Sequence, residues 1–273
     1  MAFVHVNGID LHYIIDGTQG PWITLSHSLA CNLSAWDAQV EVLKAHFRVL
    51  RFDSRGHGQT SAPPGPYTLD QMAADVHGLF LHLGIERTHW LGISMGGMIG
   101  QTYALAHPQC FESLILADST SRRPPEAAVM WGERIRIAQT QGMQGLVEST
   151  LARWFTADFR VSHPEVMARI GKGILDTPVN GFCGCCDAIS KIDLLDRLPE
   201  IKCPTLIMVG EHDHGTPPEM SREMHANIAQ SEFLLIPNAA HIASIEQEAV
   251  FNSVMLKFLK KHTHLTLSAG KVS

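Results

Sequence analysis

Short runs of hydrophobic residues recur along most of the chain, and their spacing predicts the local structure. In FVHVNGIDLHYII (3–15) two alternating runs flank Asn7-Gly8, a dipeptide that strongly favours a tight hairpin turn. Further short apolar runs predict strands at 22–28, 47–53, 88–93, 111–118, 204–210 and 233–237.

Helical spacing occupies the intervals between these runs. Over 69–83 the apolar residues recur every three or four positions, behind a capping-box pattern at Thr68 and Gln71 and ahead of a C-cap glycine, Gly84. We also expect helices from a Ser34 cap to about residue 45, at 95–107, at 217–229, and at 244–260, the last starting with a capping-box pattern at Ser244 and Gln247. Strand–helix alternation predicts an α/β fold, with a mostly parallel, twisted sheet covered by helices on both faces and an antiparallel hairpin at one edge.

The segment 121–195 breaks this alternation. It contains helical stretches without a clear strand and lies between two predicted core strands. An insertion at that point emerges at the carboxyl edge of the sheet, where ligands bind in such folds. The predicted organisation is therefore a core of 1–120 and 196–262, a helical cap of 121–195 and a flexible tail of 263–273.

Composition narrows the functional classes. The chain has 273 residues, 45% hydrophobic and 18% charged, which is ordinary for a globular protein. A formal net charge of −6 gives no basic footprint for nucleic acid, and no apolar run is long enough to span a membrane. Six irregularly spaced cysteines do not suggest a disulfide framework, and no signal peptide is visible. We therefore expect a cytoplasmic protein, and the sequence does not indicate its oligomeric state.

A candidate nucleophile stands between a predicted strand and a predicted helix. The stretch Gly92-Ile93-Ser94-Met95-Gly96 has the spacing of a nucleophile elbow, in which flanking glycines permit a turn too tight for side chains. Such a turn exposes the Ser94 hydroxyl at a helix N-terminus, where a developing anion is favoured.

A serine hydroxyl needs a base, and that base needs an orienting carboxylate. Of sixteen histidines, His241 is favoured because it follows the strand at 233–237 and fits the chain order Ser, Asp, His. Asp213 closes the strand and loop PTLIMVGEHD and is the favoured acid, while Asp118, at the end of FESLILAD, is its competitor.

An oxyanion hole requires two converging backbone N–H groups. The N–H of Met95, directly after the nucleophile, is the first candidate. The N–H of Leu29, in the loop after the strand at 22–28, is the second.

Together these segments resemble the α/β-hydrolase superfamily. The resemblance rests on HSL, FDSRGHGQTS, GISMGG, GEHD and IPNAAH and extends over about residues 1–262. It implies an α/β-hydrolase fold with a Ser94, Asp213 and His241 triad. Family members often have His-Gly where this chain has His27-Ser28, which leaves the shape of the oxyanion loop open. The motif of Asp53, Arg55, Gly56 and Gly58 is interpreted as a structural turn without a catalytic role.

The cap resembles that of the 3-oxoadipate enol-lactonases. The matching pieces are LARWFTADF (151–159) and GFCGCCDAISKIDLL (181–195). Cys183, Cys185 and Cys186 are then small packing groups rather than metal ligands, and no zinc motif accompanies them. The family's Ala-Ile is usually followed by Arg-Asp, where this chain has Ser190-Lys191. The change is either a neutral surface swap or a sign that the substrate has no carboxylate. Arg122, Arg123 and Arg153 are alternative sources of a cation.

The resemblance implies a serine hydrolase of carboxylic esters that acts through an acyl-enzyme, without metal or cofactor, on a small-molecule lactone or ester. A 3-oxoadipate enol-lactone-like substrate is favoured. A neutral N-acyl homoserine lactone or simple ester is the alternative, and a C–C hydrolase, cofactor-free haloperoxidase or non-catalytic receptor is less favoured. Trp131, Trp154 and Phe182, with Met130, are candidates for the substrate-binding wall of the cap.

Overall fold

An eight-stranded sheet forms the centre of the protein. The computed structural model describes residues 2–263, so the predicted tail lies outside the described residues apart from Thr263. Across the sheet the strands lie in the order β1 (Ala2–Val6), β2 (Ile9–Asp16), β4 (Arg48–Phe52), β3 (Trp22–Ser26), β5 (Thr88–Ile93), β6 (Phe111–Ala117), β7 (Thr205–Gly210) and β8 (Ser231–Ile236).

The strand directions confirm the predicted sheet. β1 pairs antiparallel with β2, and β2 antiparallel with β4, while the strands from β4 to β8 pair in parallel. The predicted hairpin turn is present, because Asn7 and Gly8 both have positive φ angles, 46° and 75°. All residues of β5 and of β7 are buried, as expected for parallel strands covered on two faces.

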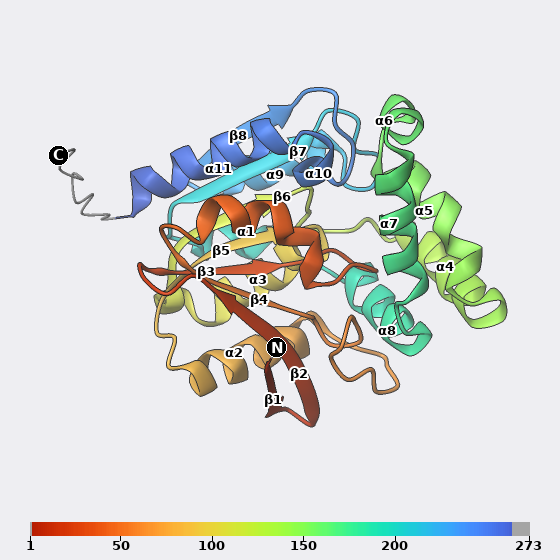
Figure 1. Cartoon of the computed structure of the whole chain (residues 1–273), viewed down its shortest axis with the longest axis horizontal. Coiled ribbons are helices and arrows are strands. Elements are labelled where there is room, and N and C mark those ends of the chain that lie inside the picture. Colours follow the sequence, from red (N-terminus) through yellow and green to blue (C-terminus); the bar gives the residue numbers. More distant parts are fainter. Residues whose placement is uncertain (1, 264–273) are drawn as a thin grey trace.

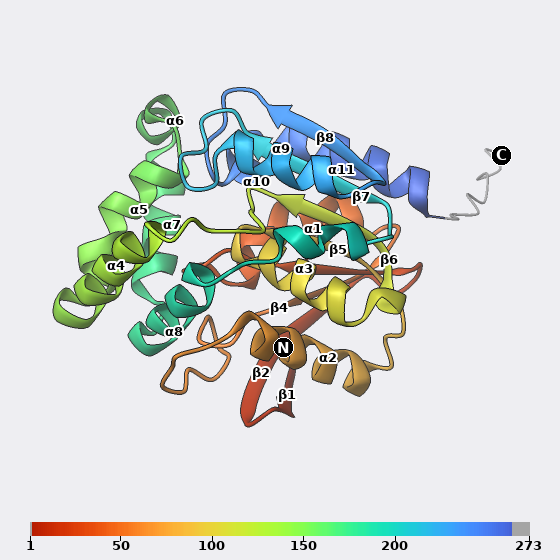
Figure 2. The same cartoon turned by 180° about the vertical axis from the view of Figure 1, so that it is seen from behind.

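Helices cover both faces of this sheet. The core helices and 3₁₀ turns are η1 (Leu33–Trp36), α1 (Asp37–Leu43), α2 (Leu69–Leu83), α3 (Met95–Ala106), η2 (Pro108–Cys110), η4 (Leu195–Glu200), α9 (Pro218–Asn227), α10 (Ala243–Glu246) and α11 (Glu248–His262). Helices α1 and α11 lie on the face toward the viewer in Figure 1, and α2, α3 and α9 on the face toward the viewer in Figure 2. Helices on both faces of a mostly parallel sheet confirm the predicted α/β fold class.

The helix boundaries confirm both predicted caps of α2 and correct two other predictions. The Thr68 side chain accepts the Gln71 N–H at 3.0 Å, and Gly84 ends α2 with φ 64°. Ser34 does not cap the helix predicted from residue 34 to about residue 45. The side chain of Asn32 caps this stretch instead, at the start of η1. The helix predicted over 244–260 is two helices, α10 and α11, which are separated at Gln247.

The segment 121–195 is helical and lies at one end of the sheet in both views (Figures 1 and 2). Its elements are α4 (Ala127–Gln141), η3 (Met143–Leu146), α5 (Val147–Trp154), α6 (Ala157–Ser162), α7 (Pro164–Leu175) and α8 (Val179–Ser190). The two ends of the segment meet, since the Leu194 N–H donates to Ser121 O and the Arg123 N–H donates to Ile192 O. We interpret this arrangement as a cap that enters and leaves the core at one neck.

Among residues 2–263, no helix combines the length and the apolar character that crossing a membrane requires.

Candidate active site

Ser94 lies in the turn between β5 and α3, in a backbone conformation that residues other than glycine rarely adopt. Its φ is 52° and its ψ is −115°. The turn is tight: a Cβ atom on Gly92 would lie 2.2 Å from Gly96 O, and one on Gly96 would lie 2.0 Å from Ser26 O. The spacing of the two glycines around Ser94 is therefore required by backbone contacts on both sides of the turn.

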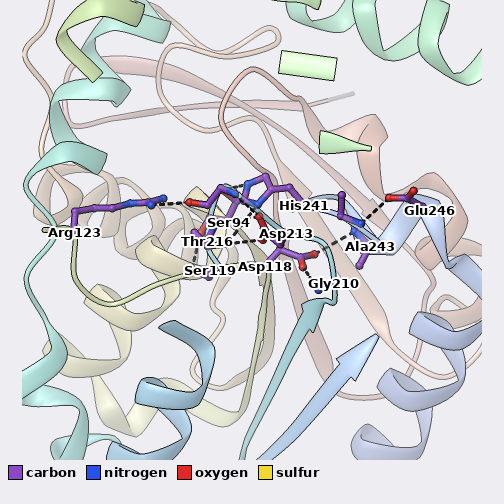
Figure 3. A network of polar contacts seen from close by, with 12 residues as sticks. Ser94, Asp118, Ser119, Arg123, Gly210, Asp213, Thr216, His241, Ala243 and Glu246 are labelled. Carbon is purple, nitrogen blue, oxygen red and sulfur yellow. Dashed lines mark hydrogen bonds and ion pairs between the residues drawn. The ribbon is translucent and has the colours of Figure 1, made fainter. Parts of the chain in front are cut away.

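His241, in the loop after β8, connects Ser94 to Asp213 (Figure 3). Its Nε2 lies 2.9 Å from Ser94 Oγ, and its Nδ1 lies 2.8 Å from Asp213 Oδ2. An ionised carboxylate can only accept hydrogen bonds, so Nδ1 carries the ring proton and Nε2 accepts the Ser94 hydroxyl proton. The structure thus brings together all three residues of the predicted triad, with the histidine in the tautomer that a general base needs.

Asp213 is held in its charged form. Burial raises the pKa of its carboxyl, but the nearby His241 and several hydrogen bonds outweigh burial and leave the pKa below the ordinary value. The donors are the Gly215 N–H at 2.7 Å, the Thr216 N–H at 2.9 Å and the Thr216 hydroxyl at 2.7 Å. Thr216 was not among the predicted site residues, although its place three residues after Asp213 is typical of a loop that hydrogen-bonds its own carboxylate.

Asp118, the competing acid, has a different set of partners. Its carboxylate accepts the Gly210 N–H at 2.8 Å and the Ala243 N–H at 3.2 Å. Burial, followed by the charge of Asp213, raises the pKa of Asp118 well above its ordinary value. Asp118 thus links the end of β7 to the start of α10, and it is Asp213 that hydrogen-bonds to His241.

Glu246 fixes the loop that carries His241, a role that the sequence did not reveal. The predicted capping box at 244–247 is not formed, and α10 has no side-chain cap. Glu246 instead accepts the Ala240 N–H at 2.8 Å and the Thr156 N–H at 3.0 Å. One carboxylate therefore ties the His241 loop to the segment between α5 and α6 of the cap.

The two predicted oxyanion donors come from different segments of the core. Met95 begins α3, and Leu29 lies in the loop after β3. Within the described part of the chain, neither backbone N–H donates to a protein acceptor. Both groups are thus free to bind a ligand oxygen, and their use as an oxyanion hole stays a prediction.

The three predicted wall residues lie in the cap and are buried. Trp131 on α4 and Phe182 on α8 are bridged by the Arg134 guanidinium, 5.9 Å and 5.6 Å from the two ring centroids. Trp154 ends α5, and its carbonyl accepts the Ile242 N–H at 3.2 Å, which places it next to the His241 loop. Contact of these rings with substrate stays a prediction.

Three arginines surround Trp131. The guanidinium carbons of Arg123, Arg134 and Arg153 lie 5.8, 5.9 and 5.9 Å from the indole centroid. Burial, then the charge of Arg153, lowers the pKa of Arg123 and of Arg134 to about 10, so both stay charged at neutral pH. Between residues 2 and 263, none of the three forms an ion pair with a carboxylate. Positive charge that no ion pair neutralises therefore collects at this point of the cap, where the charge of Asp213 also acts on Arg123 and Arg153.

The other candidate cations lie elsewhere. Arg122 is paired with Asp193 and Asp196 at the neck of the cap, at 2.5 and 2.7 Å. Lys191 lines a separate surface cleft with Asp70 and Asp193 among others. Of the cations weighed from the sequence, Arg123 and Arg153 remain, and Arg134 joins them from α4.

The cysteines of α8 are free thiols. Cys185 and Cys186 are buried, and burial raises the pKa of both, so the thiols stay protonated. In the described residues, no group of three or more His, Cys, Asp or Glu side chains is arranged to hold a metal ion.

Comparison with known proteins gives this geometry a context. A family model described as the alpha/beta hydrolase fold matches residues 21–248. The chain is 32% identical over 241 residues to 3-oxoadipate enol-lactonase 2 of Acinetobacter baylyi, covering 88% of this chain and 89% of the relative.

Two solved structures are similar along almost their whole length. The enol-lactonase from Burkholderia xenovorans LB400 has a TM-score of 0.91 and 40% identity, covering 95% of this chain and 100% of that one. A thermophilic esterase from Thermogutta terrifontis, solved with malate bound, has a TM-score of 0.89 and 32% identity, covering 96% and 97%.

The backbone contacts at Ser94 make a prediction about folding. Gly92→Ala would place a Cβ 2.2 Å from Gly96 O, and because that neighbour is backbone it cannot rotate away. We expect the variant to lose about 3 kcal/mol or more of unfolding free energy, as overpacking in a rigid site does, measured by urea denaturation. Gly132→Ala on α4 is the control, because nothing lies within 4 Å of its added Cβ, and its stability should equal or slightly exceed that of the wild type. Equal stability of all three proteins would contradict the role of the contact.

Proposed function

The chain belongs to the alpha/beta hydrolase family, within its group of enol-lactonases and esterases, and from this premise we propose that it hydrolyses carboxylic esters through Ser94. The observation that carries the proposal is the continuous hydrogen-bonded line from Ser94 Oγ through His241 to Asp213. A serine with a base at 2.9 Å, and a base oriented by a carboxylate, is the arrangement that activates a hydroxyl for attack on a carbonyl carbon.

In the proposed reaction, His241 Nε2 takes the Ser94 proton as Oγ attacks the ester carbonyl. The Leu29 and Met95 N–H groups bind the oxyanion, each contributing about 3 kcal/mol, the loss seen when a single such donor is deleted elsewhere. The imidazolium, stabilised by Asp213, then gives its proton to the leaving oxygen as the C–O bond breaks. Water activated by His241 hydrolyses the acyl-enzyme and regenerates the Ser94 hydroxyl.

We propose a lactone as the substrate class. The named relatives in Acinetobacter baylyi and Burkholderia xenovorans are enol-lactonases, and they are similar to this chain along most of its length. A lactone leaves its alcohol or enol tethered to the acyl group, so ring closure competes with hydrolysis. Rapid entry of a water molecule next to His241 is therefore a requirement of this reaction.

The arginines around Trp131 support a substrate with a carboxylate. Like charges that are partly removed from water repel one another, and an anion between them would relieve that repulsion. Arg123 also donates to Gly215 O at 2.7 Å, so the cluster is joined to the loop that holds Asp213. Arg153 borders a cleft of about 260 Å³ that Arg160, His212 and His214 also line, which gives an anion a favourable approach. The related Thermogutta esterase, solved with malate, a dicarboxylate, supports the same preference.

A substitution of Ser94 tests the proposed nucleophile. Ser94→Ala should lower kcat on a chromogenic ester and on a lactone by on the order of 10⁶-fold, because no other group can form the acyl-enzyme. Far-ultraviolet circular dichroism should remain that of the wild type. Ser162→Ala, an exposed serine on α6, is the matched control and should retain full activity. An active Ser94→Ala enzyme would refute the proposal.

Amide substitutions separate the roles of the two buried carboxylates, Asp213 and Asp118. Asp213→Asn should reduce kcat by about 10⁴-fold, since the amide can no longer hold the Nδ1–H tautomer of His241. Asp118→Asn should leave kcat within about tenfold, because its partners are the backbone groups of Gly210 and Ala243. Steady-state kinetics of both variants on one ester would show which of the two carboxylates orients His241. If Asp118→Asn were inactive and Asp213→Asn active, the assignment of the acid would be wrong.

The charge of the substrate can be tested by pH-stat assays that compare 3-oxoadipate enol-lactone with a neutral N-acyl homoserine lactone. We expect a higher kcat/KM for the carboxylate-bearing lactone. Arg153→Gln should lower that value by about 10- to 100-fold, the worth of one charged hydrogen bond, and change the neutral substrate by less than about threefold. Arg136→Gln is the control, because Arg136 is exposed and pairs with Glu133. Preference for the neutral lactone, unaffected by Arg153→Gln, would indicate an acyl substrate without a carboxylate.

A further inference from the structure

Two buried histidines hold the backbone on either side of Leu29. The His27 ring lies against the peptide before Leu29, with Nδ1 2.7 Å from Ser28 O, and its Nε2 accepts the Ser54 N–H at 2.9 Å. The His57 ring lies against the peptide after Leu29, and its Nε2 accepts the Ala30 N–H at 2.9 Å. The two rings are 5.3 Å apart between centroids.

These contacts fix the direction of the Leu29 N–H. The Ser28 carbonyl and the Leu29 N–H belong to one peptide plane, so the bond to Ser28 O turns the N–H to the opposite side. The bond from Ala30 to His57 fixes the next peptide plane, and with both planes fixed, the two backbone angles of Leu29 are set. Ala30 itself has φ 57°, an unfavourable conformation for a residue with a Cβ, which persists only where its surroundings enforce it.

His57 performs this task as a neutral ring. Because its Nε2 accepts a hydrogen bond from a backbone N–H, the proton is on Nδ1, which points to Arg55 O at 3.3 Å. Burial, followed by the charge of His27, lowers the pKa of His57 to about 3, so the ring remains an acceptor at neutral pH.

The cap helix α8 is packed directly against the turn that carries His57. A Cβ atom on Gly181 would lie 1.9 Å from Gly56 O, so the two backbones touch. One turn further along α8, Cys185 Sγ lies 3.6 Å from Arg55 O and 3.9 Å from His57 Nδ1. Gly181 and Cys185 are four positions apart, which places them on the same face of the helix.

We propose that His57 is a positioning residue for ester hydrolysis: it sets the Leu29 N–H as an oxyanion donor, and the Gly181 and Cys185 face of α8 holds His57 in place. The inference rests on the proposed function, since the Leu29 N–H stabilises an oxyanion only if Ser94 attacks a carbonyl. It assigns the cap a second role besides enclosing substrate, because the cap completes the geometry of a donor that belongs to the core.

The experiment compares an acceptor with a non-acceptor at position 57. His57→Leu keeps the approximate volume and removes the acceptor, and it should lower kcat by roughly 10- to 100-fold, below the full loss of one oxyanion donor. KM should change by less than about threefold, and affinity for a boronic acid transition-state analogue should fall in parallel with kcat. His57→Gln offers Oε1 to the Ala30 N–H and should recover most of both losses. His89→Gln, a buried histidine bonded to Ser113 at the other end of β5, is the control for general destabilisation.

A second pair of variants tests the cap without touching a histidine. Gly181→Ala should share the kcat loss of His57→Leu, because the added methyl group must displace the turn at Gly56. Gly173→Ala on α7, with nothing within 4 Å of its Cβ, should behave as the wild type.

The outcomes separate the two proposals. Wild-type kcat in both His57→Leu and Gly181→Ala, or equal losses in His57→Leu and His57→Gln, would overturn the positioning role and leave the hydrolase intact. A wild-type protein that neither hydrolyses esters nor binds the boronic acid would overturn both. If His57→Leu failed to fold, the two glycine variants would still test the proposal. A loss of kcat in Gly181→Ala but not in Gly173→Ala would support the positioning role, and wild-type kcat in both would overturn it.

Discussion

The close backbone contact at the start of α3 is the constraint on which the site depends. Gly96 rests on the carbonyl of Ser26, the last residue of β3, so the helix begins directly on the end of that strand. Met95 follows Ser94 directly and starts the helix, while the Leu29 loop leaves the end of β3, so this contact fixes where the Leu29 loop lies relative to Ser94 and Met95. The strained turn at Ser94 persists because β6 supports it: the Ser94 N–H donates to Ala117 O at 2.9 Å.

The second constraint is that two carboxylates are buried at neighbouring strand ends. Asp118 follows β6 and Asp213 follows β7, and two unpaired charges so close together would be costly in a buried site. The surroundings move the pKa values of the two carboxyls apart. His241 and Thr216 lower the pKa of Asp213 and favour its ionised form, whereas burial and the charge of Asp213 raise the pKa of Asp118. Asp118 does not bind His241, and it links Gly210 to Ala243 by accepting a hydrogen bond from the backbone N–H of each. The His241 loop is therefore held by Glu246 on one side and by Asp118 on the other.

The features that the sequence predicts well depend on residues close together in the chain. The hairpin at Asn7-Gly8, the cap at Thr68 and the turn at Ser94 are of this kind, and the order of strand ends was enough to propose His241 and Asp213. Where local signals compete, prediction fails: Asn32 rather than Ser34 caps η1, because its side chain reaches the backbone two residues on. Contacts between distant segments carry no local pattern. Glu246 binds Thr156 across 90 positions, and Arg134 joins Arg123 and Arg153 only after the cap has folded.

The run GFCGCC at 181–186 forms one helix by local spacing, and its residues also make contacts with distant segments of the chain. Its glycines and Cys185 are small on the side of α8 that meets the core, where Gly181 touches Gly56 and a Cβ on Gly184 would lie 2.8 Å from the Tyr67 ring. Its larger member, Phe182, packs instead beneath Arg134 on the side toward α4. The helix is thus two-sided, with one face set by the backbone of the core and the other by the cationic cluster around Trp131. In this arrangement, Phe182 and the face toward α4 can change with the substrate. The residues of the face toward the core, Gly181 and Cys185 among them, are limited to those that leave the Leu29 loop in place.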